Sequence, residues 1–534
     1  MAPKGRLLGL LLALVSAETS LCGMFPNLTQ NDPLPLFSTV FPNDFLATRQ
    51  KANLMRYDYT YAPARFRVSV SAYRQYANRA KDQERQTIYP GDIHGRWNML
   101  AFFYDPIMNN VLTQALELPT PDADCVPFLT KPRYSDPRQE FGFFSIPLLY
   151  RKYGVRFESE LLLVDRCFYA VGIMAQWGIN DIRQTVLNFN DMTCQALGTA
   201  CPTATVPQGV TAAPPSCPKP NPAEPIAIAP PFVDPSTVPP CPQPACNPDG
   251  QAACVIPLQP FQSVCDTTLN FGFPSDCKQY VINNIMNQRS RMLHVLGLED
   301  CNYHKVGMDD IRLSMYWRQL FVINEDNERY PRVVFMPFAQ VGVGIPMMKE
   351  IDNREIFALP NGNNRHTFVG GRAGCTIDFL DTIDIYAVGG FSYFFEREYC
   401  NLGLPTNSKE SGIFPYSADV TIRPGPTWNF NFGMNAYHFL DNLSVWVEYA
   451  IVSHTPDKIK VCRSFIPQNS RYFESGFQID RAECASKWEV HLVNVGFNYD
   501  LFDCLSIGLL WQAPAKQRNA YRSGMVMGTV TFVY

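Results

Sequence analysis

The sequence ends in Met525-Val526-Met527-Gly528-Thr529-Val530-Thr531-Phe532-Val533-Tyr534, a stretch that alternates in the manner of a β-strand. Its larger apolar and aromatic residues share one face, with Gly528 between them, and its two threonines share the other. A transmembrane β-barrel tolerates no unpaired sheet edge in lipid, so its final strand is both terminal and indispensable. We therefore expect an all-β protein, a transmembrane antiparallel barrel, with a terminal β-signal that includes Phe532 and Tyr534.

The start of the sequence predicts export. Lys4 and Arg6 precede an apolar run over 7–15, and small and polar residues follow. That order is typical of a secretory signal peptide, and the run is about half of the roughly 20 residues that a spanning helix needs. We expect a signal peptide at 1–23, cleaved after Ala17 or after Gly23.

Composition agrees with a barrel. Aromatic residues make up 13% of the 534 residues and charged residues 18%, whereas soluble domains carry about 25% charge. A barrel shows apolar residues to lipid and polar residues to its lumen, which accounts for both values. The net charge of −4 and the absence of basic clusters exclude nucleic acid as a partner.

Period-two alternation recurs along the chain, and three similar turns punctuate it. At 428–437, apolar residues oppose asparagines, and 65–72 and 311–318 alternate in the same way. The turns at 379–384, 439–444 and 501–506 place their aspartates 60 and 62 residues apart. Short turns at one rim and long loops at the other are typical of outer-membrane barrels. We count about 14 strands, or 16 if 140–163 is divided, and the pattern slips near Leu492-Val493, as a β-bulge would cause.

A proline- and cysteine-rich insertion interrupts the pattern. Nineteen prolines lie between 195 and 276, and proline cannot donate to a β-ladder. We therefore predict N-terminal barrel strands at 24–179, an insertion at 180–308 with a short helical segment near 281–296, and C-terminal barrel strands at 309–534. The insertion caps the extracellular mouth or folds into the lumen, and the sequence does not choose between them.

Cysteines in an exported chain are read first as disulfides. Seventeen are present, and the metal interpretation is weak because no Cys-x-x-Cys occurs. The disulfide candidates in and next to the insertion are Cys194, Cys201, Cys217, Cys241, Cys246, Cys254, Cys265, Cys277 and Cys301.

No catalytic, cofactor or metal motif is evident, so we expect no enzyme and no cofactor. Function then depends on the lumen. The residues that alternation points inward are Arg65, Arg67, Arg156, Glu158, Glu160, Arg312, Arg318, Arg372, Asp378 and Glu448. Rings of charge set ion preference in pores, and the excess of arginine predicts weak anion selectivity.

The signal peptide, the aromatic-rich strands, the terminal β-signal and the many cysteines together resemble the major outer membrane porins of chlamydiae and chlamydia-like bacteria. The resemblance covers about 50–534 and implies a porin for passive diffusion of small hydrophilic solutes, with disulfides that stabilise or cross-link the bacterial envelope. It gives such roles to Cys125, Cys400, Cys462 and Cys484, whereas Cys375 lies on an apolar face. The implied partners are outer-membrane lipid, the barrel assembly machinery and other cysteine-rich envelope proteins. The sequence leaves open whether the protein also forms a homo-oligomer.

Two other classes of protein fit the same pattern. One is a non-conducting outer-membrane adhesin or structural barrel, and the long insertion favours it. The other is a secreted, disulfide-rich soluble β-protein. Surfactant dependence separates the barrel from the soluble protein, and solute flux separates the pore from the plugged barrel.

Overall fold

A computed structural model of the chain describes residues 66–118, 143–191, 288–324, 333–348 and 351–533, apart from short turns and single residues within them. The signal peptide, the segment 192–287, Arg65 and Tyr534 lie outside the described residues. So do these disulfide candidates: Cys125, Cys194, Cys201, Cys217, Cys241, Cys246, Cys254, Cys265 and Cys277.

Twelve antiparallel strands form a closed barrel, which confirms the predicted fold class. The ring closes because β1 pairs with β23 at one seam and β7 pairs with β10 at the other. In order around the ring the strands are β1 (Phe66–Ala77), β6 (Leu148–Arg166), β7 (Tyr169–Val186), β10 (Ile311–Gln319), β12 (Val333–Ile345), β13 (Phe368–Phe379), β14 (Ile383–Phe394), β17 (Thr427–Leu440), β18 (Leu443–His454), β20 (Trp488–Phe502), β21 (Leu505–Arg518) and β23 (Gly524–Val533).

The predicted strand count of 14 to 16 is wrong. The stretch 140–163 contains two strands, but only β6, which runs for 19 residues, enters the ring, whereas β5 (Phe143–Ser145) pairs in a separate small sheet. Two short strands, β9 (Tyr303–Met308) and β11 (Phe321–Asn324), pair with β7 and β12 beyond the two ends of β10, so they extend its position and add no strand to the ring. Alternation indicates that a strand has one polar and one apolar face, but it does not indicate whether that strand is long enough to cross the membrane.

The predicted insertion boundaries also need correction. β7 continues to Val186, and β9 lies within the range 180–308 that was assigned to the insertion. The helix α8 (Arg289–Val295) falls in the segment predicted to be helical. The barrel wall therefore extends past residue 179 before the proline-rich part begins.

Outer and inner faces follow the predicted alternation. On β17, Trp428, Phe430 and Phe432 are more than half exposed, whereas Asn431 and Asn435 are buried. On β23, Val526, Val530 and Phe532 face outward, and Met527, Thr529 and Thr531 face inward. The register shift between His491 and Leu492 is the predicted bulge. An apolar outer belt of this extent needs lipid, because a water-exposed patch of that size would aggregate.

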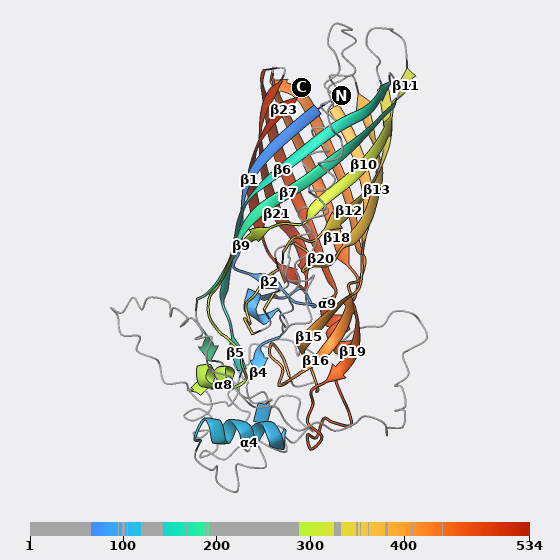
Figure 1. The fold of residues 1–534 in the computed structure, drawn as a ribbon. Helices are drawn as coiled ribbons and strands as arrows, with labels where there is room; N and C mark the ends of the chain where they lie inside the picture. Colours follow the sequence, from blue (N-terminus) through green and yellow to red (C-terminus); the bar gives the residue numbers. More distant parts are fainter. Residues whose placement is uncertain are drawn as a thin grey trace, which may run out of the picture.

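The two ends of the barrel differ. The predicted turns join β13 to β14, β17 to β18 and β20 to β21, all at one end, where β6 and β7 are also joined by a short turn. The other end carries long connections and additional secondary structure (Figure 1). By the asymmetry that outer-membrane barrels show, we assign the short-turn end to the periplasmic side and the other end to the extracellular side.

A folded domain covers the extracellular end, and we call it the cap (Figure 1). One of its sheets consists of β15 (Arg397–Leu404), β16 (Tyr416–Arg423) and β19 (Lys458–Ser464). A second, smaller sheet consists of β2 (Ala80–Lys81), β3 (Thr87–Ile88) and β22 (Ala520–Tyr521). A third consists of β4 (Trp97–Asn98), β5 (Phe143–Ser145) and β8 (Asn190–Asp191). Its helices are η1 (Pro90–Asp92), α4 (Pro106–Ala115), α8 and α9 (Ile479–Ser486).

The cap and the barrel share one apolar core. Trp97, Phe102 and Leu112 of the cap pack in the same cluster as Tyr150 and Ile182, which lie at the extracellular ends of β6 and β7. Buried side chains thus fix the cap to the extracellular end of the barrel. Among the described helices, none combines the length and the hydropathy that a membrane crossing requires.

Candidate functional site

The lumen is the candidate site, and the predicted lining residues lie on its wall. Six of them face inward and are buried: Arg67, Arg156, Glu158, Glu160, Arg318 and Glu448. Arg312 and Arg372 face inward on the same strand faces as Tyr316 and Thr376 and are half-buried. Arg65 lies outside the described residues.

Arginine–glutamate pairs line one wall of the lumen. Arg67 on β1 lies 2.5 Å from Glu160 on β6, and Arg156 lies 2.5 Å from Glu158 along β6. Tyr316 on β10 donates a hydrogen bond to Glu160. Charge-assisted bonds of this kind are strong where water is excluded, so they hold both carboxylates against the wall.

Arg372 extends this wall across β12 and β13. Its Nε donates to Gln340 Oε1 over 2.5 Å, and the amide of Gln340 donates to Ser314 Oγ over 2.6 Å. The three side chains are direct or diagonal neighbours on β13, β12 and β10. One polar chain therefore connects three adjacent strands below the cap.

Glu448 stands on the opposite wall, on β18. It accepts hydrogen bonds from Tyr386 Oη at 3.1 Å, Asn431 Nδ2 at 3.3 Å and Asn494 Nδ2 at 2.8 Å. Gln512 donates to Asn494 in turn, at 2.9 Å. These three donors are neutral, two amides and a phenol, and they come from the neighbouring strands β14, β17 and β20.

Charge is therefore segregated around the lumen. Away from the short-turn rim, the described inward cations are Lys152, Arg156, Arg312 and Arg372, and the carboxylates are Glu158, Glu160 and Glu448, which gives 4 − 3 = +1. Among the described side chains, the rim itself has Arg67 and Arg318 together with Asp378, Asp384 and Asp500, which gives 2 − 3 = −1. An anion would meet an attractive middle section behind an acidic rim.

Large inward rings lie flat against the wall. Five of them stand directly opposite a glycine on the next strand, in the pairs Tyr73 and Gly154, Tyr316 and Gly172, Phe368 and Gly344, Tyr386 and Gly433, and Trp446 and Gly496. In each pair, a Cβ on the glycine would clash with the ring. Because the ring occupies the space of the missing side chain, its bulk runs along the wall and does not cross the lumen.

Sequence reasoning missed part of this lining. Lys152 and Asp384 are inward and almost fully buried, although neither was a candidate. The amide side chains Asn431, Asn494 and Gln512 were also missed, although the asparagine alternation at 428–437 was visible. Only the register of neighbouring strands shows that amides from β17, β20 and β21 gather around Glu448.

The lumen becomes apolar where it meets the cap. Ala450, Val452, Val490 and Leu492 face inward there and form a cluster with Trp488. Val452 and Ala450 are fully buried. Solutes cannot hydrogen-bond to this section, so any path through it must follow the polar strands on the other side.

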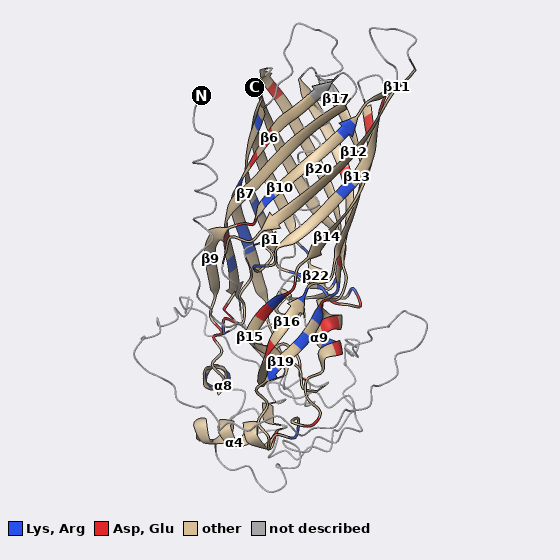
Figure 2. Cartoon of the chain, turned by 45° about the vertical axis from the view of Figure 1, so that its right-hand side comes forward, with Lys and Arg blue, Asp and Glu red and all other residues tan. Residues whose placement is uncertain are grey.

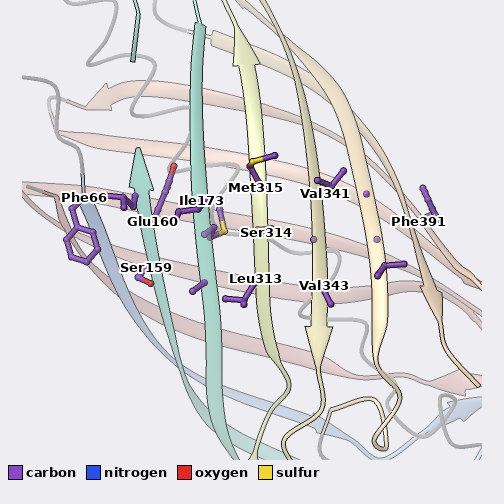
Figure 3. A pocket seen from close by; sticks show the side chains of 17 residues that line it. Phe66, Ser159, Glu160, Ile173, Leu313, Ser314, Met315, Val341, Val343 and Phe391 are labelled. Carbon is purple, nitrogen blue, oxygen red and sulfur yellow. The ribbon is translucent and has the colours of Figure 1, made fainter. Parts of the chain in front are cut away.

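An apolar groove of about 800 Å³ opens on the outer face; most of its lining residues face outward, and Glu160 and Ser314 of the polar lumen wall also contribute to it. Its walls include outward residues of five strands, Leu161, Ile173, Leu313, Met315, Val341 and Phe391 (Figure 3). Small residues such as Ala175 and Gly371 also line it. A groove with this lining belongs to the lipid-facing surface, where acyl chains pack, and it is not a solute site.

The cysteines need one correction. Cys301 and Cys484 are disulfide-bonded, but Cys462 is an exposed free thiol, and Cys400 is also a thiol exposed on the cap. They lie on β19 and β15, on either side of β16, so two strand spacings, roughly 10 Å, separate them. A disulfide needs Cα atoms within about 7 Å. Cys375 is a half-buried free thiol on the outer face of β13.

Within the described ranges, no group of three or more His, Cys, Asp or Glu side chains is placed to hold a metal ion.

No protein-family model and no curated protein matches this chain. Solved structures with similar architecture include an outer membrane channel from Pseudomonas putida F1, with a TM-score of 0.40 and 9% identity over 90% of this chain and 98% of that one. The translocator domain of the autotransporter NalP from Neisseria meningitidis has a TM-score of 0.25 and 5% identity, over 92% of this chain and 96% of that one. The outer membrane channel DcaP of Acinetobacter baumannii has a TM-score of 0.22 and 8% identity, over 88% of this chain and 97% of that one. These similarities are too weak to identify a relative.

Proposed function

We propose that the protein is a narrow channel of the bacterial outer membrane through which small hydrophilic solutes diffuse, with a weak preference for anions, and that it catalyses no reaction. The observation that carries the proposal is the pairing of the large inward rings with glycines. A barrel of eight strands is just filled by its own side chains, and twelve strands enclose more room. Rings that lie along the wall preserve this room.

The charged lining supports the anion preference. The middle section of the lumen has four cations and three carboxylates among the described residues. Fixed charges in a narrow lumen raise the local concentration of the opposite ion. The acidic rim opposes entry from the periplasmic side, so the preference is weak.

Reconstitution tests the channel directly. Liposomes that contain the purified protein should swell in small sugars and amino acids and should exclude larger oligosaccharides. In planar bilayers under a KCl gradient, the reversal potential should have the sign of chloride preference, and Arg372→Gln should reduce it. Cation preference would contradict the charge assignment, and liposomes that do not swell would contradict the channel.

The second candidate is a non-conducting structural barrel. It is favoured by the burial of the inward side chains, since Asn494 and Gln512 are fully buried, and by the apolar cap end. In that case the ion pairs would stabilise the barrel interior and would not steer solutes. The swelling assay separates the two functions, because only the channel passes sugars.

A role in envelope cross-linking would use the exposed thiols of the cap. The Sγ atom of Cys462 lies 3.2 Å from Thr421 Oγ1 on a solvent-exposed strand, so a partner's disulfide could reach it. Higher-mass bands on non-reducing gels should disappear with Cys462→Ser and persist with Cys375→Ser. Equal bands in both variants would contradict this role.

A further inference from the structure

A basic patch lies on the outer face of the barrel, on strands next to the β9 edge. It consists of Arg74 on β1, Arg151 on β6, Arg183 on β7 and His304 on β9, and Figure 2 shows basic residues on this wall close to the cap. Arg151 stands directly opposite Arg183, and Arg183 stands directly opposite His304. Directly opposite residues have Cα atoms about 5 Å apart, so the patch is continuous.

The patch lies at the extracellular edge of the apolar belt. The outward residues of β7 are apolar from Tyr169 to Ile179, and Asp181 and Arg183 follow. Ten residues at about 3.3 Å each, tilted by about 40°, span roughly 25 Å, which is the height of the apolar band in outer-membrane barrels. Tyr76 and Tyr153 lie at the level of the patch, as expected for an interfacial aromatic girdle. The basic side chains therefore reach the headgroup layer.

Carboxylates do not balance the patch. Asp181 binds Arg183 at 2.5 Å and His304 at 2.9 Å. Arg74 packs over the ring of Tyr153, 5.5 Å from its centroid, and within the described part of the chain neither Arg74 nor Arg151 has a carboxylate partner. The three arginines and Asp181 alone sum to 3 − 1 = +2. Like charges directly opposite on a sheet repel, so Arg151 and Arg183 leave a place for an anion between them.

The rest of the belt shows that the patch is local. On β14 and on β17 up to residue 436, which also reach the cap end, the outward side chains that the structure describes are apolar or aromatic and none is charged. On β21, Lys516 is exposed, but its neighbour His491 contacts Glu489. A general attraction to an anionic membrane surface would not require the three arginines to lie on adjacent strands, so their clustering points to one binding site.

We propose that the basic patch binds the phosphate of a phosphorylated lipid in the outer leaflet. Guanidinium groups form paired hydrogen bonds with phosphate oxygens, and two arginines whose Cα atoms are about 5 Å apart can both reach one phosphate. The acyl chains of that lipid would lie on the apolar belt below. The inference rests on the membrane barrel and does not depend on conduction, so a silent channel would leave it intact.

Native mass spectrometry of the full-length protein in a zwitterionic detergent tests the site, with dioleoyl phosphatidic acid as the probe and dioleoyl phosphatidylcholine as the comparison. We expect phosphatidic acid to bind at least fivefold more tightly than phosphatidylcholine. Arg151→Gln should lower its affinity at least fivefold, and Arg74→Gln and Arg183→Gln should lower it less. Lys516→Gln, an exposed cation at the same end outside the patch, should stay within twofold of the unchanged protein.

Each result has a definite meaning. Equal binding of the two lipids, or unchanged binding in Arg151→Gln, would overturn the proposal. Displacement of the lipid by 10-fold excess inorganic phosphate would also overturn it, because the site would then take free phosphate. Unboiled samples on a denaturing gel, where folded barrels migrate differently from boiled ones, confirm that each variant is folded before binding is compared.

Discussion

The barrel and the cap bury opposite kinds of residue. The cap encloses Trp97, Phe102 and Leu112 and exposes polar loops, whereas the barrel encloses Glu448 and its amide partners and exposes Phe432. The cap has water around it, and hydrophobic burial drives its folding. The barrel has lipid around it, so apolar side chains gain little by turning inward, and polar side chains must find partners within the lumen.

The largest expected effect comes from the core of the cap. Trp97 is buried, stacks on Phe357 with centroids 5.6 Å apart and donates from Nε1 to Gly91 O over 3.1 Å. Trp97→Ala should cost the cap about 3–5 kcal/mol, since it leaves a cavity. Limited proteolysis should then cut the cap while the barrel keeps its heat-modifiable mobility.

The matched change on the outer belt is Trp428→Ala, which should cost less than about 1 kcal/mol because lipid chains fill the space. A loss in this variant as large as that in Trp97→Ala would mean that Trp428 does not face lipid. Cleavage of the barrel together with the cap in Trp97→Ala would show that the two regions unfold as one unit.

A charge on the outer belt should have the next largest effect. Phe432 is 53% exposed in the middle of the outer face of β17. Phe432→Arg should destabilise the inserted barrel by about 2–4 kcal/mol, which is the cost of arginine near the bilayer midplane. Urea titration of the barrel folded in vesicles measures this cost.

The control is Asn429→Arg, three residues away on the inward face of the same strand. Here the new charge meets a polar lumen, so we expect a loss below about 1 kcal/mol. If both variants lost the same stability, the assignment of lipid and lumen faces on β17 would be wrong.

The pH dependence of the cap should be of intermediate size. Glu410 is buried and accepts hydrogen bonds from Thr406 N and Oγ1, both at 2.6 Å, and from Asn407 Nδ2 at 2.7 Å. Burial raises the pKa of its carboxyl group from 4.5 to about 7, although the Thr406 bonds and Arg481 act in the other direction. The folded cap therefore holds this proton more tightly than the unfolded chain does.

The sign follows from that difference. The contribution of Glu410 is fully present below pH 4.5 and is lost as the pH rises through 7. We expect the cap to lose on the order of 2 kcal/mol between pH 5 and pH 8, measured as resistance to proteolysis in urea. Glu410→Gln should flatten this dependence. A cap that gains stability with rising pH would show that the carboxylate is held in its ionised form.

The barrel was predictable from sequence because its evidence is local. Alternation on β1, β10 and β17 and the three repeated turns identified the faces, one rim and even the bulge near Leu492. The strand count and the cap were not predictable. A short strand such as β16 alternates as a barrel strand does, and only its pairing with β15 and β19 places it outside the ring.

The candidate site was predictable to a similar degree. A charged residue on the polar face of an alternating strand is visible in the sequence, so Arg67, Arg156 and Glu448 could be predicted as lumen residues. The pairing of rings with glycines could not, because it depends on which residue of the next strand stands opposite. Tyr386 and Gly433 are 47 residues apart in sequence (433 − 386), and β14 and β17 bring them into register.

The smallest expected effect concerns these glycines and compares the lumen wall with the lipid face. A Cβ at Gly433 would collide with the ring of Tyr386, whose hydroxyl group donates to Glu448 over 3.1 Å. Gly433→Ala should therefore push the ring into the lumen, cost about 1 kcal/mol by overpacking and lower single-channel conductance. Gly528→Ala, on the outer face with no atom within 4 Å, should be neutral or stabilising by about 0.5 kcal/mol. If Gly433→Ala left both stability and conductance unchanged, the ring would be mobile enough to yield, and glycine pairing would not be what keeps the lumen clear.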